Sequence, residues 1–113
     1  MIPPLRLCLA FCLATSALFA AQAVPTSIDA ARAEIYKTTG TTQLRLFIFE
    51  PTTGPKENRP AIVFFFGGGW TSGSPTQFEP HCRHLASRGM VAIVADYRVA
   101  SRHAALIIER YVV

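Results

Sequence analysis

AIVFFFGGGW, at residues 61–70, is the stretch that decides the fold of this 113-residue chain. Its first six residues are a continuous run of apolar, β-branched and aromatic side chains, which predicts a strand buried on both faces. Three glycines, Gly67, Gly68 and Gly69, end that strand. Because glycine has no side chain to shield its N–H group and adopts conformations closed to other residues, the loop is predicted to hold an anion.

A helix is predicted after the glycines. Ser74 is placed to be its N-cap, Pro75 takes the first helical position and Gln77 the third. An interior proline, Pro80, loses a backbone hydrogen bond, so we expect a kink, or a short turn followed by a second helical start. Gly89 is expected to end the helix.

A second strand and a hairpin complete the predicted fold. MVAIVA at residues 90–95 predicts another fully buried strand, so strand, crossover helix and strand form a βαβ unit with parallel strands. Upstream, residues 33–37 and 42–49 predict a hairpin with its break at 39–41, and residues 51–60, with two prolines around a glycine, predict a solvated loop. The predicted fold class is α/β.

The first 23 residues have the pattern of a secretory signal peptide. One charge, at Arg6, precedes an apolar run over residues 7–20, and Ala21-Gln22-Ala23 matches the small-x-small cleavage pattern. The alternative is a membrane anchor, but the run of about 14 residues is shorter than the roughly 20 that a spanning helix needs. We therefore expect residues 1–23 to be removed, and residues 24–113 to be a secreted or periplasmic partial domain with no stable membrane span.

The charge and cysteine content of the sequence argue against a nucleic-acid-binding protein and against a fold held by internal disulfides. Removal of Arg6 lowers the net charge from +4 to +3, because 11 minus 1 basic residues then face 7 acidic ones. These charges are scattered and form no basic run, so no nucleic-acid partner is expected. Cys8 and Cys12 leave with the signal peptide, and Cys82 alone cannot form an internal disulfide.

Two kinds of nucleotide-binding loop also follow a buried strand, and the sequence departs from both. A dinucleotide loop needs glycine at its first, third and sixth positions, but Ser72 is the sixth residue from Gly67. A phosphate-binding loop needs Lys and Ser or Thr after its last glycine, but Ser74 and Pro75 follow Gly73. No cofactor is therefore expected. The glycine N–H groups are left to stabilise the negative charge of a tetrahedral intermediate.

The segment FFFGGGW at residues 64–70, followed by Asp96-Tyr97-Arg98 after the next predicted strand, resembles the α/β-hydrolase serine esterases. The resemblance is to the lipase and carboxylesterase branch, the hormone-sensitive-lipase-like proteins with a His-Gly-Gly-Gly motif, and it covers residues 33–103. It implies the N-terminal part of an α/β-hydrolase fold. Phe66 stands where that branch usually has His, so the hydrogen bonds by which the His shapes the loop are missing.

The resemblance also implies roles for residues of the loop. Gly68 and Gly69 would donate their N–H groups to the oxyanion, Gly67 would shape the turn, and Trp70 would line the pocket. A core position is the alternative for Trp70, since tryptophan is highly buried on average. Asp96, at a strand end, is expected to be a scaffold residue.

The catalytic triad of the family has no counterpart in this sequence. Its nucleophile lies in Gly-x-Ser-x-Gly, and its acid and histidine follow further along the chain. None of the serines stands between two glycines at that spacing: Ser16, Ser27, Ser72, Ser74, Ser87 and Ser101. No catalytic residue is therefore assigned. The family's sheet order places the nucleophile strand beside residues 62–66, so we expect an incomplete sheet with an unpaired apolar edge.

A metal site is not expected either. His81 and His84 are three residues apart on the predicted helix with Cys82 between them, but no third convergent ligand is evident. Cys82 belongs instead to the apolar stripe of that helix, formed at helical spacing by Phe78, Cys82, Leu85 and Ala86.

The expected function is that of a secreted carboxylic-ester hydrolase fragment, truncated or frame-shifted from a longer gene. The chain would carry the oxyanion loop, lack the triad and be inactive alone, while the full-length relative would act on a small-molecule or polysaccharide ester. The alternative is a small secreted, non-catalytic binding or interaction module.

Overall fold

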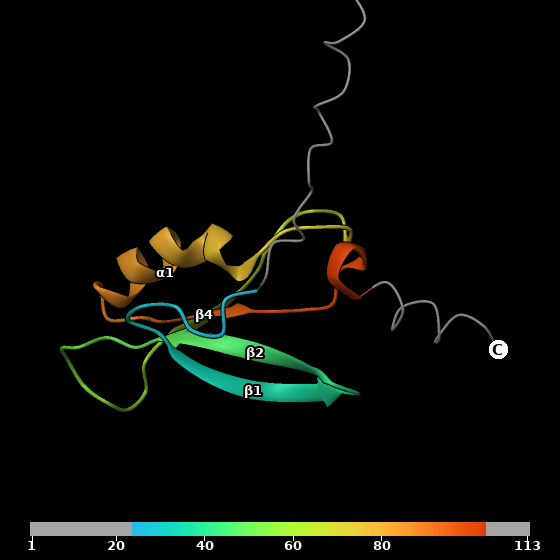
Figure 1. The fold of residues 1–113 in the computed structure, drawn as a ribbon. Helices are drawn as coiled ribbons and strands as arrows, with labels where there is room; N and C mark the ends of the chain where they lie inside the picture. Colours follow the sequence, from blue (N-terminus) through green and yellow to red (C-terminus); the bar gives the residue numbers. More distant parts are fainter. Residues whose placement is uncertain (1–23, 104–113) are drawn as a thin grey trace, which may run out of the picture.

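The computed structural model describes residues 24–103, which form a four-stranded mixed sheet with a helix packed on it (Figure 1). The strands lie in the order β1-β2-β4-β3, and their bounds are β1 Arg32–Thr39, β2 Thr42–Phe49, β3 Ala61–Phe65 and β4 Val91–Ala95. A short 3₁₀ helix, η1 (Pro75–Phe78), and the helix α1 (Glu79–Ala86) connect β3 to β4. The predicted hairpin followed by a βαβ unit is confirmed.

The hairpin of β1 and β2 places aromatic side chains in the core. β2 pairs with β4 in antiparallel register, with Phe47 opposite Val94 and Phe49 opposite Ala92. Because side chains alternate along a strand, both phenylalanines lie on the same face of the sheet. Phe47 is 0% exposed and Phe49 is 1% exposed.

The helical connection begins where the sequence predicts. The Ser74 hydroxyl accepts a hydrogen bond from the N–H of Thr76 at 3.4 Å, and Pro75 opens η1. Pro80 lies in the first turn of α1, where a missing N–H costs no helical hydrogen bond. The predicted interruption therefore takes the form of a 3₁₀ turn followed by a separate helix.

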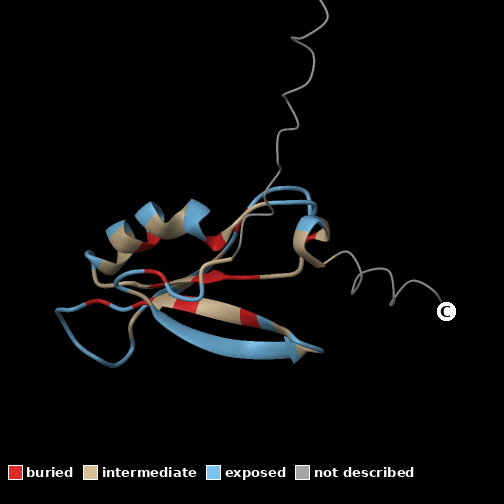
Figure 2. Ribbon diagram, in the orientation of Figure 1, coloured by how far each residue is buried: buried red, intermediate tan, exposed pale blue. Residues whose placement is uncertain are grey.

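The core lies between α1 and the face of the sheet that α1 covers (Figure 2). Removing these side chains from water supplies the main driving force for folding, at roughly 25 cal/mol per Å² of apolar surface. The lead-in to β1 contributes to this core through Ile28. The buried members are Ile28, Phe47, Phe49, Cys82, Ala92 and Val94.

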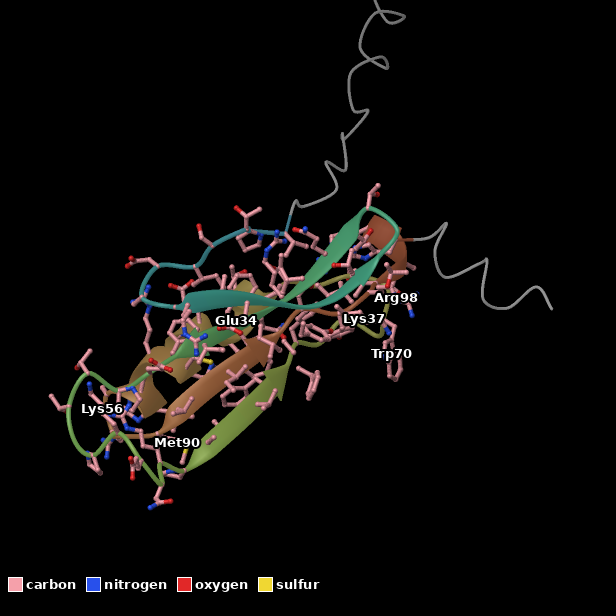
Figure 3. All side chains as sticks on the ribbon, turned by 90° about the horizontal axis from the view of Figure 1, so that it is seen from below. Glu34, Lys37, Lys56, Trp70, Met90 and Arg98 are labelled. Atoms are coloured by element: carbon pink, nitrogen blue, oxygen red, sulfur yellow. The ribbon has the colours of Figure 1, made fainter. Side chains whose placement is uncertain are left out.

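The opposite face of the sheet is open at β3, so the prediction of a strand buried on both faces is wrong for this element. Val63 and Phe65 are 46% and 66% exposed, whereas Phe64 on the other face packs against the core. Seen from below, β3 and β4 lie in front of α1 (Figure 3), and within residues 24–103 no helix or strand covers them. β3 pairs there with β4 alone, so the expected open edge is present.

The signal peptide predicted at residues 1–23 lies outside the described residues, as do residues 104–113. Within residues 24–103, no helix is both long enough and apolar enough to cross a membrane.

Candidate functional site

The glycine loop, residues 67–73, leaves the carboxyl end of β3 and leads into η1. Gly68 closes its tight turn: its carbonyl oxygen accepts hydrogen bonds from the N–H groups of Thr71, at 3.0 Å, and Ser72, at 3.3 Å. Gly68 has a φ of +138°, and a Cβ there would lie 2.1 Å from the carbonyl oxygen of Ser72. A side chain at this position therefore conflicts with the turn, so the observed loop requires glycine here.

The three glycine N–H groups differ in their partners. The N–H of Gly67 donates to the side-chain Oε1 of Gln77 at 2.7 Å. The N–H groups of Gly68 and Gly69 donate no hydrogen bond to an acceptor among residues 24–103. Both residues are exposed. Two consecutive unpaired N–H groups at a strand end can bind an oxyanion, which is the role that the family resemblance implies for Gly68 and Gly69.

The stacked rings of Phe66 and Tyr97 support the start of the glycine loop. Phe66, which is 2% exposed, stacks on Tyr97 with ring centroids 4.2 Å apart. The Tyr97 hydroxyl donates to the carbonyl oxygen of Phe66, and the Arg102 guanidinium carbon lies 5.7 Å from the centroid of the Phe66 ring. The residue that replaces the family's His is thus a packing residue, and the hydrogen bonds to the loop come from other side chains.

The far end of the loop is held by a buried ion pair. A guanidinium nitrogen of Arg102 lies 3.1 Å from the carboxylate of Asp96, and the two side chains are 8% and 3% exposed. The same guanidinium donates to the carbonyl oxygen of Gly73. Asp96 therefore acts on the loop through Arg102, as expected of a scaffold residue rather than a catalytic acid.

Burial also changes the acid–base properties of this cluster. It raises the pKa of Asp96 above its ordinary value, and the positive charge of Arg102 opposes this shift. Burial and the charge of Arg102 lower the pKa of His103. The Nδ1 atom of His103 accepts the N–H of Val99 at 3.3 Å.

Backbone hydrogen bonds connect the middle of the loop to the segment that follows β4. The N–H of Ala100 donates to the carbonyl oxygen of Trp70 at 2.8 Å, and that of Ser101 donates to Thr71 at 2.9 Å. The motif at the glycines and the motif at Asp96, far apart in the sequence, therefore form one structural unit.

Trp70 projects from the loop (Figure 3) and is 75% exposed. The alternative of a core position for Trp70 is therefore wrong. Two cavities of about 230 and 270 Å³ lie against α1, and Trp70 lines neither of them. Its role as a pocket wall stays a prediction.

The histidines of α1 do not assemble a metal centre in the described chain. Between residues 24 and 103, no group of three His, Cys, Asp or Glu side chains is placed to share a metal ion. Cys82 is 0% exposed, and burial raises the pKa of its thiol to about 11. His81 packs against the rings of Phe64 and Phe78, at centroid distances of 6.3 and 5.5 Å.

Sequence reasoning missed Gln77 and Arg102 as residues that support the loop. Gln77 was interpretable only as a capping residue of the helix, since its ten-residue separation from Gly67 gives no pattern. Arg102 lies beyond the Asp96-Tyr97-Arg98 motif, at the edge of the described chain. The available signal was that Arg102 follows Asp96 by a few residues, because a buried carboxylate is usually paired with a positive charge.

A family model described as "alpha/beta hydrolase fold" matches residues 62–107. This segment begins in β3 and contains the glycine loop, the helical connection and β4. The chain is also 29% identical over 65 residues to carboxylesterase NlhH of Mycobacterium tuberculosis, a match that covers 57% of this chain and 20% of that protein. It is 40% identical over 60 residues to neuroligin-like protein glit-1 of Caenorhabditis elegans, covering 51% of this chain and 8% of that protein.

Solved structures of an esterase have a fold similar to that of this chain over about two thirds of its length. The apo form of Thermogutta terrifontis esterase 2 matches with a TM-score of 0.63 and 52% identity, over 69% of this chain and 30% of that one. The propionate-bound form of the same enzyme matches with a TM-score of 0.63 and 53% identity, over 67% of this chain and 28% of that one. The chain thus spans less than a third of the length of these relatives.

Proposed function

We propose that this chain is part of an alpha/beta hydrolase of the carboxylesterase type and supplies the oxyanion-stabilising loop of a secreted enzyme that hydrolyses short-chain carboxylic esters. The match to a curated carboxylesterase and to a solved esterase supports the reaction class. Because the chain covers only part of each relative, the activity, substrate and secretion of the whole protein belong to this proposal.

The observation that carries the proposal is the pair of adjacent N–H groups at Gly68 and Gly69 that have no acceptor within residues 24–103. When a nucleophile attacks an ester carbonyl, the oxygen becomes an anion. Donors held about 2.7–3.1 Å from that oxygen stabilise the transition state, and each contributes on the order of 3 kcal/mol. The bonds to the Gly68 carbonyl hold the two N–H groups in place before any substrate arrives.

The attacking group is expected from outside the described residues. Asp96 is 2% exposed and paired with Arg102, so it is not available to orient a catalytic histidine. The sequence contains no Gly-x-Ser-x-Gly motif. We therefore expect these residues to bind the ester carbonyl and stabilise charge, and the chain by itself to lack turnover.

Short acyl groups are the proposed substrates. Thermogutta terrifontis esterase 2 has been solved with propionate and with butyrate bound, and these are products of short-chain ester hydrolysis. Secretion follows from the predicted signal peptide, and N-terminal sequencing of exported protein should begin at Val24. A mature protein that retains residues 1–23 would contradict this location.

A direct test is turnover by the purified chain. The expected result is no hydrolysis of p-nitrophenyl butyrate above background. Turnover that a serine-directed phosphonate abolishes would contradict the prediction that the chain alone is inactive.

A chimera tests the loop in a working enzyme. Residues 62–103 of this chain replace the aligned segment of Thermogutta terrifontis esterase 2, to which the chain is 52% identical. The chimera should hydrolyse p-nitrophenyl butyrate. Alanine keeps the backbone N–H, but its Cβ would conflict with the carbonyl oxygen of Ser72. Gly68→Ala should therefore displace the N–H groups of residues 68 and 69 and lower kcat about 10²-fold or more, as loss of an oxyanion donor does. Gly89→Ala, in the same graft and outside the loop, is the matched control, because Gly89 also has a positive φ, of +90°, but a Cβ there meets nothing within 4 Å. An unchanged kcat in the Gly68→Ala chimera would refute the proposed role.

The open edge of β3 favours one second candidate, the small secreted binding module. An unpaired strand edge can accept another strand, and Val63 and Phe65 present apolar surface on the adjoining open face of the sheet. A monomeric chain that melts cooperatively and shows no activity in either test would favour this candidate. An active chimera would favour the esterase.

A further inference from the structure

We propose that Gln77 is a positioning residue of the glycine loop: by accepting the N–H of Gly67, it fixes the start of the loop so that Gly68 and Gly69 keep their N–H groups free. This inference rests on the proposed function of those two glycines as oxyanion donors. The family's His shapes the loop through hydrogen bonds, and Phe66 cannot do so because its side chain has no polar atom. Gln77 would supply a loop-shaping hydrogen bond in its place.

Gln77 is exposed, and the backbone that carries its side chain is held in place. Gln77 belongs to η1, and its N–H donates to the carbonyl oxygen of Ser74 at 3.1 Å. Pro75, which is buried, fixes the backbone at the start of this turn. The acceptor oxygen is therefore presented by a turn of restricted backbone. It lies 2.7 Å from the nitrogen of Gly67. Since a backbone N–H only donates, the contacting atom of Gln77 must be its oxygen.

Gly67 depends on this bond more than its neighbours do. Its φ is not in the left-handed region, unlike those of Gly68 and Gly69. A Cβ at Gly67 would lie 3.6 Å from Gln77 Oε1, an ordinary van der Waals distance, so no steric conflict fixes its conformation. Glycine has the largest conformational freedom to lose on folding, and one hydrogen bond therefore has a large share in ordering this residue.

The other anchors of the loop begin at Gly68, whose carbonyl oxygen accepts hydrogen bonds from Thr71 and Ser72. Trp70 and Thr71 are bonded to the backbone after β4, and the carbonyl of Gly73 is bonded to Arg102. Among residues 24–103, Gln77 provides the side-chain acceptor for an N–H group of Gly67, Gly68 or Gly69, while the Thr71 hydroxyl donates to the carbonyl oxygen of Gly69 at 3.3 Å. Loss of its acceptor should therefore loosen residues 67–69 and leave residues 70–73 in place.

The test measures amide exchange with water by NMR on the full ¹⁵N-labelled chain. Gln77→Met removes the acceptor at similar side-chain length, and Gln77→Glu keeps an acceptor oxygen. A hydrogen bond with a net strength of about 1 kcal/mol corresponds to a roughly fivefold change in the closed population. Gln77→Met should therefore speed exchange at Gly67 about fivefold and shift the Gly68 and Gly69 resonances, while Gln77→Glu should stay within about twofold of the original chain.

Two controls make the result specific to the acceptor. Gln43→Met makes the same substitution in β2, where the Gln43 oxygen accepts from Arg45 at 2.7 Å, and it should leave Gly67 unchanged. Gln77→Ala also lacks an acceptor, so the test does not depend on one variant folding. Unchanged exchange at Gly67 in both acceptor-free variants would overturn the inference. So would equal effects of Gln77→Glu and Gln77→Met, because the side chain would then act through packing.

The chimera separates this inference from the proposed function. In an active chimera, Gln77→Met should lower kcat with little change in KM, because the oxyanion forms only after substrate binds. If Gln77→Met speeds exchange at Gly67 but Gly68→Ala leaves the kcat of the chimera unchanged, the oxyanion role is refuted and the structural role of Gln77 stands. If Gln77→Met leaves exchange at Gly67 unchanged but Gly68→Ala inactivates the chimera, only the inference about Gln77 is refuted.

Discussion

Substitution of Gly68 by alanine should change the stability of the loop far more than the same substitution at Gly69. At Gly69, φ is +59° and a new Cβ meets no atom within 4 Å. The cost there is that of a left-handed conformation for alanine, about 1–2 kcal/mol. The loss of glycine's freedom in the unfolded chain offsets about 0.4–1 kcal/mol of it. Gly69→Ala is therefore expected to lower the free energy of unfolding by about 1 kcal/mol or less.

At Gly68 the same change meets two obstacles. A φ of +138° lies outside the small left-handed region that alanine tolerates, and such conformations cost about 1–3 kcal/mol. The Cβ would also lie 2.1 Å from the carbonyl oxygen of Ser72, and only a backbone shift can relieve that contact. The shift breaks the bonds from the N–H groups of Thr71 and Ser72 to Gly68, each with a net contribution of about 1 kcal/mol. We expect Gly68→Ala to cost about 3 kcal/mol.

Urea unfolding of the full chain and its two variants, followed by tryptophan fluorescence and far-UV circular dichroism, measures this difference. Amide exchange at Thr71 and Ser72 reports the local effect and should rise in Gly68→Ala alone. A difference below about 1 kcal/mol between the variants, with unchanged exchange at Thr71 and Ser72, would refute the steric reasoning.

Three further outcomes are expected. Arg102→Met should lower the free energy of unfolding by about 3–5 kcal/mol, because it leaves the carboxylate of Asp96 buried without a partner; a loss below about 1 kcal/mol, as for an exposed pair, would contradict this. The thiol of Cys82, with a pKa raised to about 11 by burial, should react with a disulfide reagent only as fast as the chain unfolds, and rapid labelling of folded protein would show that the residue is accessible. Burial lowers the pKa of His103 from 6.5, so the unfolded chain binds this proton more tightly and the unfolding free energy should rise with pH in the window below 6.5. His103→Asn should flatten that rise, and an identical pH profile would exclude His103 as its cause.

The candidate site was only partly predictable from the sequence. The position of the glycine loop after β3 follows from a local pattern, the apolar run that ends in three glycines. The contacts of Gly67 with Gln77 and of Gly73 with Arg102 do not, because residues 10 and 29 positions apart have no sequence period in common. Trp70 is a similar case: its residue type favours burial, but its place at the tip of the loop leaves it exposed.

The sequence by itself determined the local elements: the hairpin, the βαβ order, the cap at Ser74 and the break near Pro80. These follow from side-chain alternation, glycine and proline stereochemistry, and capping, which act over a few residues. Only the tertiary structure decided which face of β3 is buried and which glycine N–H groups are free. Both depend on what lies across space from the strand and the loop. α1 covers one face of the sheet, and Gln77 pairs with one of the three glycine N–H groups.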